Sequence, residues 1–320
     1  MKQIILDFPK QFKAGLEAAK NIKVGGPFSN VIICGIGGSA LPGSLIPDLD
    51  VGLKIPLYTH RDYNLPSSAN PNSLILAVSF SGNTEETISA YEEAIAKKYK
   101  VVALSTGGKL QEIAQSHNLP IAIVPNDCLQ PRFGSGYLAA AALQILANCG
   151  LINDQSPAIL EMANNLKPAF WETQGQALAQ KLVDKIPVVY SSNSFKSLAL
   201  IWKIKFNENA KVMAFWNYFP ELNHNEMVGL TNLKGAFHFI IIKDQTDHER
   251  TQKRMGLFAD LAREKGAEVD FVDLTGKTKM EKIFTNLLLG DWVTYYLALA
   301  YGQDPTPVKI VEDFKKRLAG

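Results

Sequence analysis

Short, continuously apolar segments alternate with helical segments along this chain, and that alternation constrains the fold more than any other feature. In the first half, apolar runs lie at 31–34, 55–59, 73–79, 101–104 and 121–124, and helices are expected near 8–21, 84–98, 109–117 and 136–148. A strand that is apolar at every position, rather than at every second one, is buried on both faces. The pattern therefore predicts an α/β fold in which helices cover both faces of a parallel sheet.

The same pattern restarts after a break near residues 150–156, where Gly150 and Ser156-Pro157 interrupt it. Further strands are expected at 186–190, 237–242 and 269–274, with helices near 158–165, 172–184, 195–208, 247–265 and 280–300. A length of 320 residues suggests about two domains. We therefore predict two αβα domains, 1–153 and 154–304, followed by a proline-containing linker and a final helix within 305–320.

Composition excludes several classes of function. The net charge is +2 and the basic residues are scattered, which gives no field suited to nucleic acid or to a membrane surface. The apolar stretch 283–301 is interrupted by Asn286, Gly290 and Asp291, so it is typical of a buried core helix. The beginning of the sequence lacks the pattern of a signal peptide. We expect a cytoplasmic protein.

Three cysteines, Cys34, Cys128 and Cys149, lack the spacing of metal ligands. Their odd number and the absence of a signal-peptide pattern predict reduced thiols, most of them buried. No metal site is expected from them.

A loop rich in hydroxyl groups, 79–84 (SFSGNT), lies between the strand 73–79 and the helix that follows it. Hydroxyl groups and free backbone N–H groups at a helix N-terminus form an anion site, with the positive end of the helix dipole behind them. The loop contains no lysine, so hydrogen bonds would hold the anion. The alternative interpretation is that Ser81 and Thr84 only cap the helix.

A glycine-rich turn, 35–40 (GIGGSA), follows the first strand. It matches the G-x-G-x-x-A pattern of dinucleotide sites, and Asp62 lies about 20 residues further on. The glycines and Ser39 would serve a sugar hydroxyl or a phosphate equally well, because glycine lets the backbone approach a ligand closely. The turn alone does not decide between these two ligands.

An ordered set of motifs carries a resemblance to a known family. The set comprises 37–39 (GGS), 79–84 (SFSGNT), 131–134 (PRFG), 207–211 (NENAK) and 222–226 (LNHNE). Together they resemble the bifunctional phosphoglucose/phosphomannose isomerases, a branch of the sugar isomerase (SIS) fold family. The resemblance covers essentially the whole chain and implies two SIS domains, a homodimer, and neither a metal nor another cofactor.

The reaction that the resemblance implies moves a proton between C1 and C2 of an opened sugar phosphate, through a cis-enediol(ate). Glucose 6-phosphate and mannose 6-phosphate would each exchange with fructose 6-phosphate. A carboxylate is a suitable base for this step. By resemblance the base is Glu208, near the C-terminus of an expected helix, where the dipole disfavours negative charge. Without the resemblance, Glu208 would be interpreted as a solvated side chain.

The resemblance gives roles to further residues. Arg132 would stabilise negative charge on the enediolate, and His224 would assist ring opening from the other subunit. A lysine of the last helix would enter the site; we choose Lys315, with Lys316 as the alternative. The substrate contacts would be Gly37, Gly38, Ser39, Ser79, Ser81 and Thr84.

Two other classes of function compete with the isomerase. A non-catalytic SIS-type regulator would keep the hydroxyl loop and bind a sugar phosphate, but Glu208, Arg132 and His224 argue against it. The interpretation as a nicotinamide-dependent oxidoreductase is supported by the turn 35–40 alone. A glutamine-dependent aminosugar synthase is disfavoured, because no N-terminal cysteine nucleophile is present.

Overall fold

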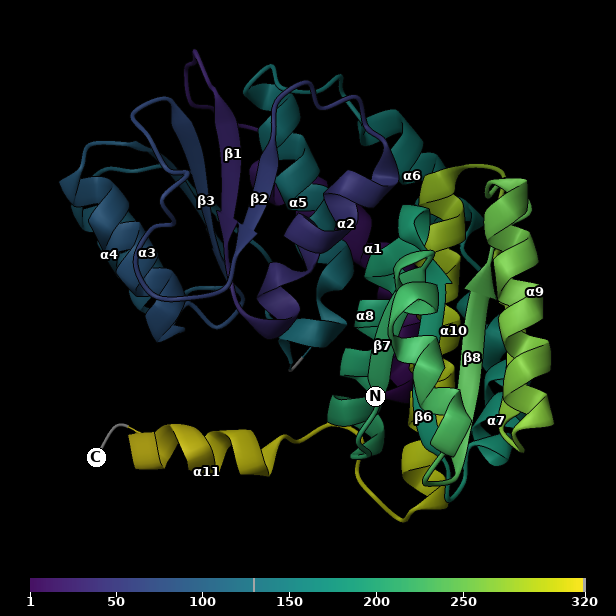
Figure 1. Ribbon diagram of the computed structural model, residues 1–320. Coiled ribbons are helices and arrows are strands. Elements are labelled where there is room, and N and C mark those ends of the chain that lie inside the picture. The colour runs from purple at the N-terminus through teal and green to yellow at the C-terminus, as the bar shows by residue number, and fades with distance from the viewer. Residues whose placement is uncertain (129, 319–320) are drawn as a thin grey trace. The chain divides into compact units, whose positions relative to one another are not determined.

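The computed structural model describes residues 1–128 and 130–318, which form two compact units (Figure 1). The first unit comprises Leu6–Leu166 and Lys279–Glu281. The second unit comprises Met1–Ile5, Lys167–Thr278 and Lys282–Gly320. Each unit is an αβα arrangement around its own parallel sheet.

The sheet of the first unit contains, among the described residues, five parallel strands in the order β2-β1-β3-β4-β5. These strands are β1 (Asn30–Cys34), β2 (Leu57–His60), β3 (Ser73–Ser79), β4 (Lys100–Ser105) and β5 (Ile121–Ile123). Two of the three interior strands, β1 and β3, are buried at every position. Their continuous apolar sequences therefore indicated correctly that helices cover both faces.

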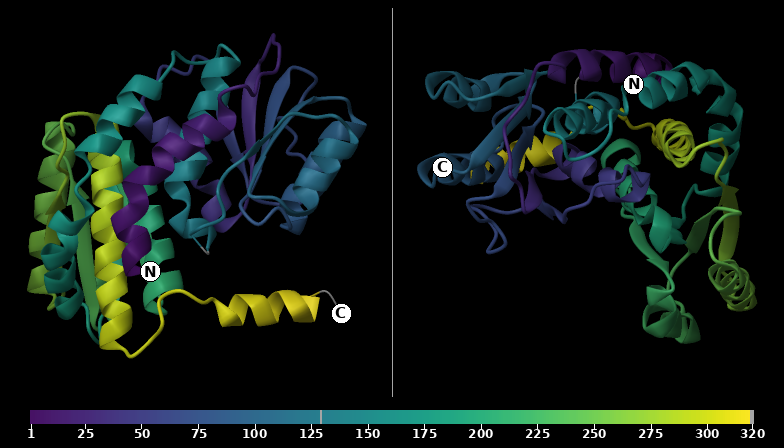
Figure 2. Two further views of the ribbon diagram at one scale, coloured as in Figure 1. Left: turned by 180° about the vertical axis from the view of Figure 1, so that it is seen from behind. Right: turned by 90° about the horizontal axis from the view of Figure 1, so that it is seen from above.

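Helices cover the first sheet on both sides (Figures 1 and 2). They are α1 (Lys2–Ala19), α2 (Leu41–Leu49), α3 (Glu85–Ala96), α4 (Gly108–Ser116), α5 (Ser135–Asn148) and α6 (Ser156–Asn165). On one face, Ile75 of β3 packs with Tyr91 of α3 and Leu110 of α4. Two short 3₁₀ turns, η1 (Gly37–Ala40) and η2 (Pro131–Phe133), precede α2 and α5. The turns therefore lie at the carboxyl ends of strands.

The second unit has a parallel sheet of four strands among the described residues, in the order β7-β6-β8-β9. They are β6 (Ile186–Ser192), β7 (Phe215–Phe219), β8 (Phe237–Lys243) and β9 (Glu268–Asp273). The sequence analysis missed β7. It is an edge strand, half-exposed over most of its length and with Asn217 at its centre, so it lacks a continuous apolar run.

The helical elements of the second unit pack around this sheet (Figure 2). They are η3 (Pro168–Trp171), α7 (Glu172–Lys181), η4 (Asn193–Phe195), α8 (Lys196–Lys205), η5 (Phe206–Ala210), η6 (Glu221–His224), η7 (Glu226–Asn232), α9 (Glu249–Glu264) and most of α10 (Lys279–Ala300). The last helix, α11 (Lys309–Leu318), instead extends away from this sheet (Figures 1 and 2). The structure ends α8 at Lys205 and continues the chain as the π-helical turn η5. The single helix expected at 195–208 is therefore two elements.

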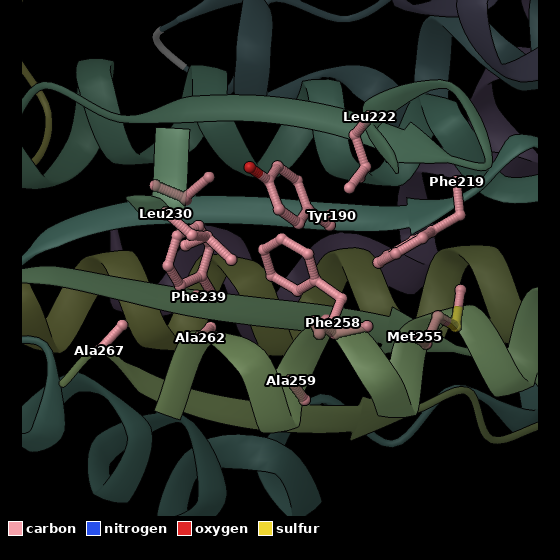
Figure 3. Packing of buried hydrophobic residues seen from close by; sticks show 12 residues of the cluster. Tyr190, Phe219, Leu222, Leu230, Phe239, Met255, Phe258, Ala259, Ala262 and Ala267 are labelled. Atoms are coloured by element: carbon pink, nitrogen blue, oxygen red, sulfur yellow. The ribbon is translucent and has the colours of Figure 1, made fainter. Parts of the chain in front are cut away.

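An aromatic cluster fills the space between the second sheet and α9. The rings of Tyr190, Phe239 and Phe258 meet with centroids 5.2–5.5 Å apart (Figure 3). Such pairs add about 0.5–1.5 kcal/mol each beyond the burial of their apolar area. The cluster packs β6, β8 and α9 together. Leu222 of η6 and Leu230 of η7 belong to the same cluster, so both turns pack against it.

Helix α10 is the one helix, among the described residues, that is long and apolar enough to cross a membrane by length and composition. Most of its apolar window, 78%, is buried inside the protein. This burial agrees with the prediction of a core helix.

Helix α11 has the opposite character, because none of its described residues is buried. Its apolar side chains, Ile310, Val311, Phe314 and Leu318, are all exposed.

Candidate active site

The glycine turn and the hydroxyl loop meet in the first unit. They follow β1 and β3, which are neighbours in the sheet, so both emerge at the same edge. The hydroxyl oxygen Oγ of Ser39 accepts a hydrogen bond of 2.9 Å from the backbone N–H of Phe80. The glycine turn and the hydroxyl loop therefore lie in contact at the carboxyl edge of the sheet, although Ser39 and Phe80 are 41 residues apart.

Arg132 lies beside the glycine turn, because the backbone at Pro131 and Arg132 closely approaches the backbone at Gly38. An added Cβ on Gly38 would lie 2.6 Å from the backbone nitrogen of Arg132 and 2.7 Å from the carbonyl carbon of Pro131. Only glycine fits such a contact. Arg132 itself is 2% exposed, and its guanidinium lies over the ring of Phe133, 4.3 Å from the centroid. Arg132 is therefore a buried residue and not a solvated one.

The hydroxyl loop does not behave as a simple helix cap. Thr84 is the N-cap residue of α3, but its side chain makes no capping hydrogen bond. Its Oγ1 instead pairs with Oγ of Ser79, at 2.9 Å. The capping interpretation is therefore wrong for Thr84. Ser81 is exposed, and its Oγ accepts a 3.3 Å hydrogen bond from the backbone N–H of Asn83.

Gly82 gives the loop its tight fold. Its φ is +73°, and a Cβ there would lie 1.8 Å from the carbonyl oxygen of Gly107. A neighbouring loop therefore supports the hydroxyl loop directly. The sequence analysis named neither Gly107 nor this contact; the only available signal was the pair of glycines at 107–108, directly after β4.

Glu208 lies in the second unit, in the middle of the π-helical turn η5. Glu208 and its neighbour Asn207 are half-buried. The residues before and after this pair are buried: Lys205, Phe206, Asn209 and Ala210. Glu208 also lines a cavity of about 520 Å³ with Lys211, Pro307 and the first residues of α11. A half-buried carboxylate at a cavity agrees better with a functional role than with a solvated one.

His224 ends η6, and its side chain is exposed. Among residues 1–128 and 130–318, its imidazole has no hydrogen-bond partner. The loop is anchored two residues later, where the carboxylate of Glu226 accepts hydrogen bonds from Tyr190 of β6 and Asn217 of β7. Burial and this contact raise the pKa of Tyr190, which keeps its hydroxyl as the donor.

Lys315 and Lys316 both lie on α11 and are exposed. Neither they nor His224 belong to the described residues that line the cavity at Glu208. The structure therefore brings the first-unit site residues Gly38, Ser39, Ser79, Thr84 and Arg132 into one region. It places Glu208, His224 and Lys315 on three separate elements of the second unit.

A second cavity of about 600 Å³ lies in the second unit and contains none of the predicted site residues. It is lined mainly by the aromatic side chains of the β6–β8 region together with η7, and Glu226 is one of its polar groups. The cavity is thus separate from the groups that the sequence analysis selected.

The three cysteines are free, as the sequence predicts. Cys34 and Cys128 are buried, and Cys149 is partly exposed. Burial raises the pKa of Cys34 to about 12, so this thiol stays protonated at neutral pH.

The chemistry of the first unit and a family match in the second unit together indicate the class of protein. Hydroxyl groups, a glycine turn and a buried guanidinium at the carboxyl edge of a parallel αβα sheet are suited to a phosphorylated small molecule. The model for the bacterial phospho-glucose isomerase C-terminal SIS domain matches residues 172–318. This part of the chain is therefore an SIS domain.

Comparison with named relatives narrows this class. The chain is 37% identical over 336 residues to a bifunctional phosphoglucose/phosphomannose isomerase of Caldicellulosiruptor bescii, covering 100% of this chain and 99% of the relative. It is 31% identical over 219 residues to a D-glucosamine-6-phosphate 4-epimerase of Sulfolobus acidocaldarius, covering 68% and 69%. The chain belongs to the family of bifunctional phosphoglucose/phosphomannose isomerases.

A solved structure supports the fold independently. The C-terminal domain of glucosamine-fructose-6-phosphate aminotransferase from Francisella tularensis superimposes with a TM-score of 0.70 at 14% identity, covering 96% of this chain and 97% of that one. At this identity the likeness concerns the fold alone. The predicted pair of SIS-type αβα domains with parallel sheets is confirmed.

Proposed function

We propose that this protein is an aldose–ketose isomerase that interconverts glucose 6-phosphate, and also mannose 6-phosphate, with fructose 6-phosphate. The observation that carries the proposal is the convergence of Gly38, Ser39 and buried Arg132 beside the hydroxyl loop. Full-length similarity to a relative that is named for both activities supports the choice of reaction. A family member that binds a sugar phosphate without turnover is the alternative.

In this proposal Ser79, Ser81 and Thr84 hold the phosphate, and Gly37, Gly38 and Ser39 contact the sugar. The loop provides hydroxyl and backbone donors, and α3 adds the positive end of its dipole. Arg132 stabilises the negative charge that develops on the enediolate oxygens. Removing one such donor commonly costs about 3–4 kcal/mol in the transition state.

Glu208 is the base in the proposed mechanism. After ring opening it takes the proton from C2 of the aldose, leaving a cis-enediol(ate), and returns a proton to C1. The half-buried position of Glu208 beside a cavity supports this role. A carboxylate can remove and return the proton in one site because its two oxygens reach neighbouring carbons.

His224 assists ring opening by exchanging a proton with the ring oxygen, since imidazole titrates near neutral pH. We assign it to the active site of a partner subunit, so the functional state is a homodimer. The exposure of the His224 imidazole supports this assignment. Lys315 of α11 completes the site near the ring oxygen, with Lys316 as the alternative.

Dual specificity requires one base to serve two epimers at C2. This is possible if the open chain rotates about its C2–C3 bond within the pocket, so that either C2 proton faces Glu208. The proposal needs neither a metal ion nor another cofactor. It places the protein in the cytoplasm, in glycolysis and gluconeogenesis, with SIS domains at 1–153 and 154–304 and a C-terminal segment at 305–320.

A coupled assay tests the function directly. Formation of fructose 6-phosphate is followed from each sugar phosphate in the presence of EDTA, for the wild type and for Glu208→Gln. The matched control is Glu264→Gln, which makes the same change at an exposed position of α9. We expect turnover of both sugars by the wild type and the control, and loss of turnover with retained binding in Glu208→Gln.

Other outcomes would redirect the proposal. Turnover of glucose 6-phosphate alone would remove the dual specificity and keep the mechanism. Tight binding without turnover of either sugar would favour the non-catalytic regulator. Because one relative is named as a glucosamine-6-phosphate 4-epimerase, glucosamine 6-phosphate is tested as a third substrate. Epimerisation of that sugar without isomerisation of the other two would contradict the proposal.

A further inference from the structure

The turn that carries Glu208 has an unusual backbone. Helix α8 ends at Lys205, and the chain continues as the π-helical turn η5 to Ala210. Lys211 then stops the turn in the left-handed conformation, with a φ of +61°. Single π-helical turns are rare and are often found at functional sites. Such a turn needs contacts outside its own backbone to fix its geometry.

The first of these contacts is a buried ion pair. Lys205, directly before the turn, is 1% exposed, and its Nζ lies 2.5 Å from Oδ2 of Asp291 on α10. The same Nζ donates a 3.3 Å hydrogen bond to the carbonyl oxygen of Leu287, one turn earlier on α10. Asp291 is itself only 6% exposed. The pair thus joins the start of the turn to the middle of α10.

The second contact lies on the far side of Glu208. Nδ2 of Asn209, a fully buried residue, donates a 3.0 Å hydrogen bond to Oγ1 of Thr294. That hydroxyl donates in turn to the carbonyl oxygen of Gly290, at 2.8 Å. Glu208 is therefore bracketed by two buried side chains, Lys205 and Asn209, that are both held by α10.

The helices also approach closely at this point. A Cβ on Gly290 would lie 2.8 Å from Nε1 of Trp202. Trp202 of α8 donates a 3.3 Å hydrogen bond to the carbonyl oxygen of Asn286. Both α8 and the Glu208 turn therefore contact α10 directly.

The energetics of the ion pair argue for a role other than stability. Removing two charges from water is costly, and an apolar pair of similar volume commonly stabilises a protein equally well or better. A buried pair that also donates a hydrogen bond to the carbonyl oxygen of Leu287 does, however, fix one relative position of α8 and α10. Catalysis is sensitive to such positions, because a misplacement of about 1 Å can lower the rate about a hundredfold.

We propose that the Lys205–Asp291 ion pair and the Asn209–Thr294 hydrogen bond are positioning contacts that fix the Glu208 carboxylate for proton transfer. This inference rests on the proposed role of Glu208 as the base. The four residues act through the backbone of η5 and do not touch the substrate. Replacing the ion pair by apolar side chains should therefore lower kcat while leaving KM and the melting temperature nearly unchanged.

The main test replaces the ion pair by apolar side chains, in Lys205→Met/Asp291→Leu. We expect kcat to fall at least about tenfold, with KM within about threefold and an unchanged melting temperature. Lys203→Met is the matched control, because it removes a lysine from the same helix two residues earlier. A double variant with wild-type kcat would overturn the proposal. So would a loss of kcat that only parallels a fall in melting temperature.

A second pair of variants tests the proposal if the double variant does not fold. Thr294→Val keeps the shape of the side chain and removes the acceptor for Asn209, whereas Thr294→Ser keeps the hydroxyl. We expect Thr294→Val to lower kcat and Thr294→Ser to restore it, with the same KM in both. Equal kcat in the two variants would contradict the positioning role.

These results are separable from a failure of the proposed function. If Glu208→Gln keeps full activity, the assignment of the base is wrong, whatever the positioning variants show. If Glu208→Gln is inactive while the double variant and Thr294→Val are both fully active, only the positioning proposal is wrong.

Discussion

Gly38→Ala is the substitution that most directly tests whether the glycine turn and Arg132 form one site. The methyl group would point at the backbone of η2, 2.6 Å from the nitrogen of Arg132 and 2.7 Å from the carbonyl carbon of Pro131. Neither atom belongs to a flexible side chain that could rotate away. The backbone of η1 or η2 must therefore shift.

The size of the effect follows from these distances. Carbon atoms in ordinary contact are about 3.5–4.0 Å from other heavy atoms, so the two backbones must separate by roughly 1 Å. Overpacking of this kind typically costs about 1–3 kcal/mol of stability. A shift of about 1 Å in Arg132 can lower catalysis about a hundredfold. We expect kcat/KM to fall about 10- to 100-fold with a modest loss of stability.

The assay is the coupled isomerase reaction, together with thermal unfolding of each variant. Gly256→Ala is the control, since a Cβ at that helical position meets no atom within 4 Å. Wild-type kcat/KM and melting temperature in Gly38→Ala would refute the reasoning, because the contact would then be neither tight nor important. A loss of stability without any loss of kcat/KM would separate the turn from the active site.

Three further predictions concern stability and reactivity. The salt bridge from Lys97 and the 2.7 Å hydrogen bond from the N–H of Leu65 hold the pKa of Glu93 below its usual range. The ionised Glu93 therefore adds to the free energy of unfolding above its unfolded pKa of about 4.3. This contribution is lost as the pH falls through the lower pKa of the folded state. Thermal unfolding should therefore show Glu93→Gln to be less stable than the wild type at pH 7, and equal to it at strongly acidic pH; equal stability at pH 7 would contradict this. Gly256→Ala should raise stability by about 0.5–1 kcal/mol in denaturant titrations, since glycine weakens a helix interior, and destabilisation would show a hidden clash. Because burial raises the pKa of Cys34 to about 12, mass spectrometry should find it unmodified by iodoacetamide in the native protein and modified after denaturation; rapid native labelling would refute its burial.

The central strands could be predicted because burial on both faces leaves a direct trace in sequence. Strand β3 is buried at all of its positions, and the expected range 73–79 matches the observed one. Strand β7 could not be predicted in the same way. As an edge strand it is half-exposed, and its polar residue Asn217 serves Glu226 in the loop beside His224. The polar residue thus interrupts the apolar pattern by which strands are found.

The first-unit site was predictable for a different reason. Ser39 follows β1 and Ser79 ends β3, and neighbouring parallel strands place their carboxyl ends together. The contact between Gly38 and Arg132 was not accessible from sequence, because it joins segments more than 90 residues apart through backbone atoms. A glycine in a sequence can indicate that the backbone lies close to another atom, but it does not identify which segment supplies that atom.

The Glu208 turn shows the same limit. Helical periodicity marks 202, 205, 206 and 209 as one face, but a lysine on such a face is usually interpreted as solvated. Only the structure shows that Asp291, 86 residues further on, neutralises Lys205 in the protein interior. The π-helical geometry of η5 also has no sequence signal of its own.

Solvent-isotope exchange tests the central claim, base-mediated proton transfer by Glu208, most directly. Glucose 6-phosphate and mannose 6-phosphate are each incubated with the protein in D₂O containing EDTA, and deuterium in the sugars is followed by NMR. The account predicts deuterium at C1 of fructose 6-phosphate from both sugars with the wild type, and none with Glu208→Gln. Conversion of the sugars with deuterium uptake that persists at the wild-type rate in Glu208→Gln would contradict it.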